Sequence, residues 1–415
     1  MIRVLIMDDT PDKTAKIKSV LKERCLLKDE EIDWAGSINS GRRKLASTVY
    51  DLLILDLVMP INDGEEVGAE GNSENFIDEL SRIGRLHKPV YIIALTQYEE
   101  KLEKHKQSYA KKLWKLIHYD LKETDWEDVL QEAVDTIVAT KDQLLKSIEE
   151  ERHYNVGILC ALPEEFEQMK LAFGNQWSSV TLAGIPYQLY ATQMRTEYGN
   201  TIKVIACCNN VPGMQAASIT ASFLLSRFDL GTLFMTGFCA GFKKKDKDDV
   251  NYGDIFIADS EYDYGSGKLV KKENEQVVMP EPKQMPCSYD ILGKLNDFIT
   301  EQLAASKLFA ELNRIGLMAE GMGMPNIHVG PGACGSYVVS DETFMQQLVK
   351  DDNRNLKGLD MEGYGLYLAG HMLNKTCVLV KGIADFGNEN KDDKYHKVCS
   401  YASAWFVHHF IKKML

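Results

Sequence analysis

Two stretches near the C-terminal end decide the fold around them: Leu359-Asp360-Met361-Glu362-Gly363 and, further along, Cys377-Val378-Leu379-Val380-Lys381-Gly382-Ile383-Ala384-Asp385. The first places a carboxylate beside a methionine. The second is an apolar run, typical of a buried strand, that ends in another carboxylate. Two segments that each end in an acid make Glu362 and Asp385 candidates for acid–base chemistry.

Length and composition describe a soluble protein with more than one domain. At 415 residues the chain exceeds one ordinary core, and its 45% hydrophobic and 26% charged residues are usual for a globular protein. The net charge of −13 argues against a nucleic-acid surface, and no apolar run reaches the ~18 residues of a membrane span. An early turn to acidic residues implies no export signal. Nine scattered cysteines indicate reduced thiols, so we expect a cytoplasmic protein.

Residues 1–124 alternate short β-branched runs with polar helical stretches, the rhythm of a parallel sheet with helices on both faces. The predicted strands are Val4–Met7, Glu31–Ala35, Leu52–Leu55, Val90–Leu95 and Leu113–Tyr119. Asp8 and Asp9 follow the first strand and Asp56 follows the third. Ligands of open α/β sheets bind at these strand ends. The three carboxylates there suit a hard cation such as Mg²⁺, with one of them left to accept a phosphoryl group.

The motifs Asp8-Asp9, Leu55-Asp56-Leu57-Val58-Met59-Pro60 and Leu95-Thr96 together resemble the receiver domain of two-component response regulators. The resemblance implies a flavodoxin-like (βα)5 fold in which Asp56 is the phosphoacceptor and Thr96 the switch residue. It implies that Asp8, Asp9 and Asp56 hold Mg²⁺, and that a histidine kinase or phosphotransfer protein is a partner. Receivers carry a lysine at the end of the fifth strand, where this sequence has Tyr119-Asp120. The alternative is a degenerate receiver kept as a dimerisation scaffold.

Residues 125–152 form a predicted helical linker that includes the last receiver helix. Its apolar residues recur largely at helical spacing: Trp126, Val129, Leu130, Ala133, Val134, Ile137, Leu144, Leu145 and Ile148. A stripe of this length is more often a packed seam than a cofactor site. We therefore expect it to make a dimer or inter-domain contact, and the protein to be a homo-oligomer, a dimer or higher.

Composition changes at His153, and residues 153–415 again alternate strands with helices. The predicted strands are Asn155–Leu162, Ile202–Cys207, Thr232–Thr236, Asp254–Ala258, His328–Val329 continuing into Tyr337–Val339, and Thr376–Val380. One predicted helix begins at Pro163, whose fixed φ suits a first turn, and another runs from Gln215 to Ser226. This part is a second α/β domain, and its size is within the range for such a fold.

Six motifs, in order, make residues 157–415 similar to the nucleoside phosphorylase and nucleosidase superfamily. They are Gly157-Ile158-Leu159-Cys160-Ala161-Leu162-Pro163-Glu164-Glu165, Asn209-Asn210-Val211-Pro212-Gly213-Met214, Thr236-Gly237-Phe238-Cys239-Ala240-Gly241, Gly253-Asp254, Ser340-Asp341-Glu342-Thr343-Phe344, and the pair quoted first. Each motif is weak alone, but six in sequence are a specific signal. The resemblance implies an α/β nucleoside-phosphorylase-like fold with Gly213 in a glycine loop and Phe238 and Cys239 in the turn under a purine base.

The resemblance also assigns chemical roles. In N-glycosidic cleavage the sugar becomes cation-like while the purine leaves with the bonding electrons. Asp385 is the expected acid at the purine N7, with a pKa raised by burial, and Glu362 is expected to bind the ribose hydroxyls. Met361 would pack on the sugar, and Phe344 would stack on the purine. Glu165 would orient or deprotonate the attacking water, although the adjacent Glu164 remains an alternative.

The nucleophile and the 5′ end of the substrate depend on charge. Phosphorylases hold phosphate with arginines near the first strand, where this chain has a pair of glutamates that would repel an anion. Water is therefore the expected nucleophile, and no cofactor is expected in this domain. Lys243 and Lys244, in a lysine cluster after the Phe238–Gly241 turn, are candidates to meet substrate phosphates as point charges. Such a run is more often a solvated loop.

Receiver plus nucleosidase resembles the effectors of bacterial anti-phage phosphorelays of the Detocs type, whose phosphorylase-superfamily domains cleave ATP to adenine and ribose triphosphate. The leading interpretation is a purine nucleotide nucleosidase, switched by phosphorylation, that acts on ATP. One alternative is a methylthioadenosine or nucleoside-type nucleosidase or phosphorylase with a regulatory receiver. Another is a non-catalytic nucleotide sensor, which the retention of Glu362 and Asp385 disfavours. No nucleic-acid or membrane partner is expected.

Overall fold

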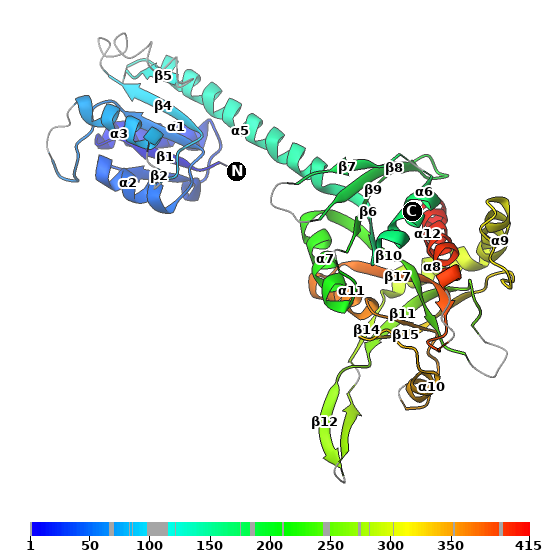
Figure 1. The fold of residues 1–415 in the computed structure, drawn as a ribbon. Helices are drawn as coiled ribbons and strands as arrows, with labels where there is room; N and C mark the ends of the chain where they lie inside the picture. Colours follow the sequence, from blue (N-terminus) through cyan, green and yellow to red (C-terminus); the bar gives the residue numbers. More distant parts are fainter. Residues whose placement is uncertain are drawn as a thin grey trace. The chain divides into compact units, whose positions relative to one another are not determined.

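In a computed structural model the chain is described over residues 2–415 apart from 66–69, 83, 85, 98–114, 121, 175, 183–186, 210, 244–249, 273, 274, 282, 302, 352 and 390–392. It divides into two compact units, residues 1–150 and 151–415, each with its own sheet and core (Figure 1). The boundary falls inside one helix, α5 (Asp125–Arg152). Among the described residues, no helix has both the length and the apolar character that crossing a membrane requires.

The first unit is built on a five-stranded parallel sheet in the order β2-β1-β3-β4-β5. Its strands are β1 (Val4–Met7), β2 (Ile32–Ala35), β3 (Leu52–Asp56), β4 (Tyr91–Thr96) and β5 (Lys115–His118). All five predicted strands are found. The strand order changes direction between β1 and β3, so the carboxyl ends of these two strands form the crevice in which doubly wound sheets bind ligands.

Alternate residues of the strands feed two separate cores, as the two-residue period of a strand requires. Val4 and Ile6 of β1 pack with α1 (Pro11–Glu23) and the first half of α5. Leu5 and Met7 pack with α2 (Ile38–Ser47) and α3 (Glu70–Arg82) on the opposite face. The sheet is therefore covered on both sides, which explains why its central strands are apolar up to their polar carboxyl ends.

Helix α5 changes character along its length. Trp126, Leu130, Val134 and Ile137 in its first half are buried in the core that they share with α1. Leu144, Leu145 and Ile148 in its second half are exposed by 59%, 46% and 46%. The stripe predicted from the sequence is thus two stripes, one that stabilises the first unit and one that stays on the surface of the helix.

The second unit contains a ten-stranded mixed sheet that closes on itself at one end. Its strands are β6 (His153–Cys160), β7 (Ser178–Val180), β8 (Leu189–Arg195), β9 (Thr201–Cys208), β10 (Asp229–Gly241), β11 (Ile255–Asp263), β14 (Lys283–Pro286), β15 (Ile327–Cys334), β16 (Gly358–Asp360) and β17 (Thr376–Asp385). β10 pairs with β16 and β17, β16 with β15, β15 with β11, and β11 with β17, which completes a ring. β12 (Gly267–Lys272) and β13 (Glu275–Pro280) form a separate hairpin.

Helices cover this sheet and bury its apolar strands. They are α6 (Pro163–Phe173), α7 (Met214–Arg227), α8 (Tyr289–Glu301), α9 (Ala304–Arg314), α10 (Glu342–Asp351), α11 (Gly363–Leu373) and α12 (His396–Met414). Helix α12 lies against α6, β10 and β17, and α11 lies against α7. Most of α12 is buried, which is why its sequence is apolar on nearly every side.

Two of the predicted strand ends are wrong in a way that matters for the site. β10 continues past Thr236 to Gly241, and β17 continues past Val380 to Asp385. Glycine weakens a strand pattern, but here it permits close packing: a Cβ on Gly382 would lie 2.6 Å from the Cys399 carbonyl oxygen of α12. The segment Tyr337–Val339 is not a strand, and β15 ends before it at Cys334.

Candidate functional site

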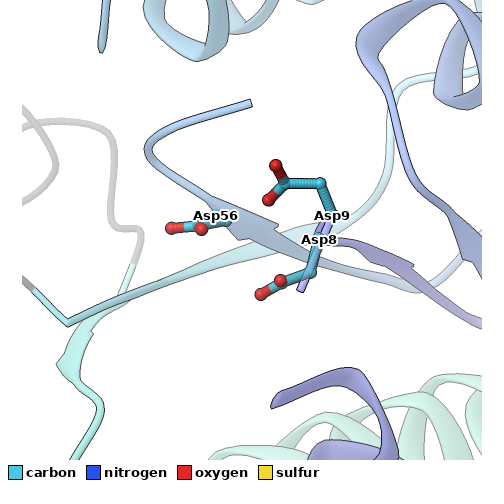
Figure 2. Close-up of side chains that lie close together, drawn as sticks. All are labelled: Asp8, Asp9 and Asp56. Carbon is cyan, nitrogen blue, oxygen red and sulfur yellow. The ribbon is translucent and has the colours of Figure 1, made fainter. Parts of the chain in front are cut away.

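Three aspartates meet at the carboxyl ends of β1 and β3 in the first unit (Figure 2). One carboxylate oxygen from each of Asp8, Asp9 and Asp56 lies within 4.8 Å of the other two. Asp8 and Asp56 are buried, and the Thr10 backbone amide donates to Asp8 Oδ1 over 2.9 Å. Thr96 at the end of β4 is fully buried. Asp8, Asp9, Asp56 and Thr96 therefore lie at one edge of the sheet, as the sequence predicted.

Lys13 of α1 reaches into this cluster, a contact that the sequence analysis did not anticipate. Its Nζ lies 2.8 Å from Asp8 Oδ2 and 3.3 Å from Asp56 Oδ2, and it donates to the Leu95 carbonyl oxygen over 3.1 Å. Lys13 is 2% exposed. A buried lysine requires such partners, because an unpaired ammonium out of water is costly.

The pKa of Asp56 depends on opposing effects of burial and of neighbouring charges. Burial raises the pKa of its carboxyl to about 6, Lys13 opposes that rise, and Asp8 adds to it. Tyr119 occupies the place after β5, with its ring centroid 5.5 Å from Lys13 Nζ. Among the described residues, the lysine that contacts Asp56 therefore comes from α1 rather than from the end of the fifth strand.

Six of the predicted residues of the second unit line one cavity of about 390 Å³: Glu165, Phe238, Cys239, Met361, Glu362 and Asp385. It opens at the carboxyl ends of β6, β10 and β17 and beside β16. Its lining is Ala161, Leu162, Glu165, Pro212, Phe238, Cys239, Ala240, Tyr337, Val338, Val339, Leu359, Asp360, Met361, Glu362, Asp385, Asp393 and His396. The volume is within the range of small-molecule sites, and the mixture of apolar walls with a few acids is typical of them.

Glu165 is held by four donors on the inner wall of this cavity. Its Oε2 accepts from the backbone amides of Ala161 (2.8 Å) and Leu162 (3.0 Å), and its Oε1 accepts from the Phe238 amide (3.0 Å) and Lys381 Nζ (3.1 Å). A carboxylate has about four acceptor positions, so those of Glu165 are filled. The neighbouring Glu164 lies outside, with its side chain 56% exposed. Of the two glutamates, Glu165 therefore belongs to the site.

Glycine makes this placement of Glu165 possible. Gly237 in β10 has φ +147°, and a Cβ there would lie 1.8 Å from Glu165 Oε1. Any side chain at position 237 would therefore push the carboxylate out of reach of the Phe238 amide.

Lys381 is a fully buried cation among three acids. Burial alone would lower its pKa, but the charges of Glu165, Glu362 and Asp360 outweigh that effect and raise it. Lys381 is 0% exposed, so it cannot also reach out to a substrate phosphate. Three carboxylates around one ammonium leave excess negative charge in the wall of the cavity.

Glu362 is aimed by the loop before α7. Its Oε1 accepts from the Gly213 backbone amide over 2.8 Å, and Gly213 adopts φ +109° to present that amide. Gly213 thus acts through Glu362 and is not part of the lining. Burial raises the pKa of Glu362; Lys381 opposes the rise, while Asp360 and Glu165 add to it.

Asp385 closes β17 and lies in the same cavity. It is 6% exposed, and its Oδ1 accepts from the Gly387 backbone amide over 2.8 Å. Met361 and Cys239 also line the cavity, as the sequence analysis predicted. The structure thus gathers Glu165, the adjacent Met361 and Glu362, and Asp385 from three separate parts of the sequence.

The aromatic wall differs from the prediction. Phe344 is not part of the lining; it packs edge-on against Tyr264, with ring centroids 5.6 Å apart. Phe238 does line the cavity, and the His396 ring stacks on it at 3.9 Å with an interplanar angle of 16°. Tyr337 is the other aromatic side chain in the lining. The segment Tyr337–Val339 lies at the cavity because it leaves the sheet after β15.

Of the predicted phosphate-binding lysines, Lys243 is not part of this lining. Lys243 is exposed, and its Nζ lies 4.3 Å from the centroid of the Phe386 ring. Lys244 lies outside the described residues. Within the described part of the chain, the lining holds five carboxylates and one histidine but neither lysine nor arginine.

Two buried lysines were the main residues that sequence reasoning missed, and both left a trace in the sequence. Lys381 interrupts an apolar strand, and Lys13 falls on the buried face of α1 with Ile17, Val20 and Leu21. A lysine at an apolar position needs a buried anion. Pairing each with the nearby acids would have located both clusters.

Comparison with known proteins gives three findings. A family model for the phosphorylase superfamily matches residues 155–412. Protein y4jS of Sinorhizobium fredii is 27% identical over 430 aligned positions, which cover 100% of both chains. ATP nucleosidase Cap17 of Escherichia coli is 27% identical over 264 positions, which cover 60% of this chain and 49% of Cap17. Among solved structures, a Helicobacter pylori methylthioadenosine/S-adenosylhomocysteine nucleosidase mutant with 5′-methylthioadenosine in its active site has a TM-score of 0.48 and 16% identity, covering 62% of this chain and 98% of that one.

Proposed function

The chain belongs to the phosphorylase superfamily through residues 155–412, and from this premise we propose that its second unit hydrolyses the N-glycosidic bond of a purine nucleotide, with ATP favoured. The observation that carries the proposal is the meeting of Glu362 and Asp385 in one cavity. A sensor that only binds a nucleotide needs no buried acid opposite the carboxylate that holds the sugar.

The proposed reaction breaks the bond between C1′ of the ribose and N9 of the purine. Its electrons pass to the base, which takes a proton at N7 from Asp385, while water adds its oxygen to C1′ and gives a proton to Glu165. Glu362 holds the ribose hydroxyls as the sugar becomes cation-like. All acceptor positions of Glu165 are filled, so Glu165 can bind the attacking water only after one of its four donors moves away. Lys381 is the donor most able to move, because the other three are backbone amides.

Two features support water rather than phosphate as the nucleophile. Four acidic side chains besides the proton donor Asp385 line the described part of the cavity, and the charges of three of them already act on Lys381. A phosphate dianion inside such a wall would meet strong repulsion. Products of hydrolysis from ATP would be adenine and ribose 5′-triphosphate.

ATP is favoured because ATP nucleosidase Cap17 aligns over 60% of this chain. The triphosphate would then lie outside the acidic wall and would need cations such as Lys243 and Lys244. A nucleoside without phosphates, such as methylthioadenosine, is the second candidate, because the described lining holds neither lysine nor arginine.

Incubating the purified protein with ATP, AMP, adenosine and methylthioadenosine, with and without phosphate, tests these candidates. We expect free adenine from ATP, with ribose 5′-triphosphate as the co-product by mass spectrometry and no dependence on phosphate. Adenine from methylthioadenosine alone would replace ATP with the second candidate. If none of the four compounds releases adenine, with the first unit phosphorylated or not, the proposed nucleosidase activity is excluded.

The pH dependence of kcat/KM should carry the mark of Glu362. Since the carboxylate form accepts the ribose hydroxyls and burial raises its pKa, kcat/KM should fall as the pH drops through a midpoint well above the ~4.3 of an ordinary glutamate. Glu362→Gln should lower kcat/KM and flatten this acidic limb. An unchanged limb in the variant would assign it to another group.

We propose further that the first unit is a flavodoxin-like receiver domain that switches this activity, in an effector that depletes nucleotides during phage infection. Asp8, Asp9 and Asp56 are three hard oxygen donors in one cluster, which fits Mg²⁺. Bound there, the ion would screen the charge of an incoming phosphoryl group. Asp56 would take this group from a histidine kinase or phosphotransfer protein, and Thr96 would bind it.

Phosphorylation at Asp56 should raise nucleosidase activity. The phosphoryl mimic beryllofluoride with Mg²⁺ should activate the wild-type protein and leave Asp56→Ala at its basal rate, with adenine release as the measurement. Equal rates with and without the mimic in the wild-type protein would reduce the first unit to a scaffold.

A further inference from the structure

Lys13 is a helix residue whose ammonium group is buried and has three polar partners. Its side chain extends from α1, and its Nζ contacts Asp8, Asp56 and the Leu95 carbonyl oxygen at once. It is buried beside two buried carboxylates. Replacing such a cation with an apolar residue together with its partners is often neutral or stabilising, so a buried ion pair is weak evidence for a role in stability.

Phosphoryl transfer would change the charge around Lys13. An Asp56 carboxylate oxygen attacks the phosphorus of an acyl phosphate such as acetyl phosphate, the bond from phosphorus to the acetate oxygen breaks, and acetate leaves with the electron pair. A carboxylate with one negative charge becomes an acyl phosphate with about two. In the described part of the site, Lys13 is the side-chain cation already in contact with Asp56.

We propose that Lys13 is the resident counter-ion of the Asp56 phosphorylation site: it holds the acceptor carboxylate in place before transfer and binds the phosphoryl oxygens afterwards. The inference rests on the proposed receiver function. It explains how the site works with Tyr119 after β5, since Lys13 Nζ lies above that ring. It also predicts competition between Nζ and Mg²⁺, because a bound ion would take oxygens of Asp8 and Asp56, which Nζ contacts.

The test compares Lys13→Met and Lys13→Arg with the wild-type full-length protein, using acetyl [³²P]phosphate and Mg²⁺. We expect Lys13→Met to lower the rate of labelling at Asp56 by about 10- to 100-fold, the worth of one charge-assisted contact. Lys13→Arg should recover part of that loss. Lys16→Met, which removes an exposed charge from the same helix, is the matched control and should label like the wild type.

Mg²⁺ affinity separates a charge role from damage to the fold. Removing the competing ammonium should tighten Mg²⁺ binding in Lys13→Met, whereas a collapsed site would bind Mg²⁺ more weakly. Trp34 is a convenient reporter, because its indole N–H donates to the Asp8 carbonyl oxygen over 2.8 Å. Equal labelling of wild type and Lys13→Met, or weaker Mg²⁺ binding in Lys13→Met, would overturn the inference. A wild-type protein that takes no label at Asp56 would instead overturn the receiver proposal on which it rests.

Discussion

Asp385→Asn should release adenine about 10²–10⁴-fold more slowly than the wild-type protein, because loss of a positioned general acid typically costs that much. Asparagine can keep the hydrogen bond from the Gly387 amide through its carbonyl oxygen, so the end of β17 should hold its shape. It has no acidic proton for the purine N7. The measurement is kcat for adenine release under saturating substrate.

Asp393→Asn is the matched control for this variant. Asp393 lines the same cavity, but its side chain is 92% exposed at the mouth. The same chemical change there should alter kcat by less than about threefold. A wild-type rate in Asp385→Asn, or equal losses in both variants, would show that Asp385 is not the acid.

Lys381→Met should lower the free energy of unfolding of the second unit by about 3–5 kcal/mol, the usual cost of removing one partner of a buried ion pair. Methionine matches the length of the lysine stem, but Glu165, Glu362 and Asp360 lose their shared cation. The measurement is urea unfolding followed by circular dichroism. Lys375→Met, which removes a half-exposed cation 3.4 Å from Asp229, is the control and should cost less than about 1 kcal/mol.

The loss in Lys381→Met should depend on pH with a definite sign. Without the cation, the pKa values of Glu362 and Asp360, already raised by burial, should rise further above their unfolded values. A folded-state pKa above the unfolded one makes the protein lose stability as pH rises. The difference in free energy of unfolding between Lys381→Met and the wild type should therefore become smaller as the pH is lowered from about 8 to about 6. A deficit that does not change with pH would mean that lost packing, not uncompensated charge, dominates.

The strands and the acidic cluster of the first unit could be predicted from the sequence because short local patterns specify them. Apolar runs such as Val4–Met7 and Leu52–Leu55 predict strands, and an acid directly after a strand lies at the edge of the sheet wherever the strand is placed. Lys13 was not found, because a helix pattern does not tell which strand end a long side chain reaches.

The second unit was predictable in part, for the same reason. Glu165, Glu362 and Asp385 belong to short motifs and lie in the cavity as expected. The aromatic wall was not predictable, because it depends on where a segment goes after its strand ends. Tyr337 is close to Phe344 in sequence, yet one lines the cavity and the other packs on Tyr264. His396 reaches Phe238 only because α12 begins at the cavity, a tertiary fact without a local signal.

The closed ring of strands also has a consequence for how the cavity of the second unit is assembled during synthesis. β17 completes the ring by entering between β10 and β11, which lie more than a hundred residues earlier in the chain. Asp385 and Lys381 are both on β17, so neither the proposed acid nor the cation that contacts Glu165 is in place on a shorter nascent chain. Pairings of such long range form slowly and late. The proposed hydrolysis would therefore begin only after β17 has been made and has paired with both strands.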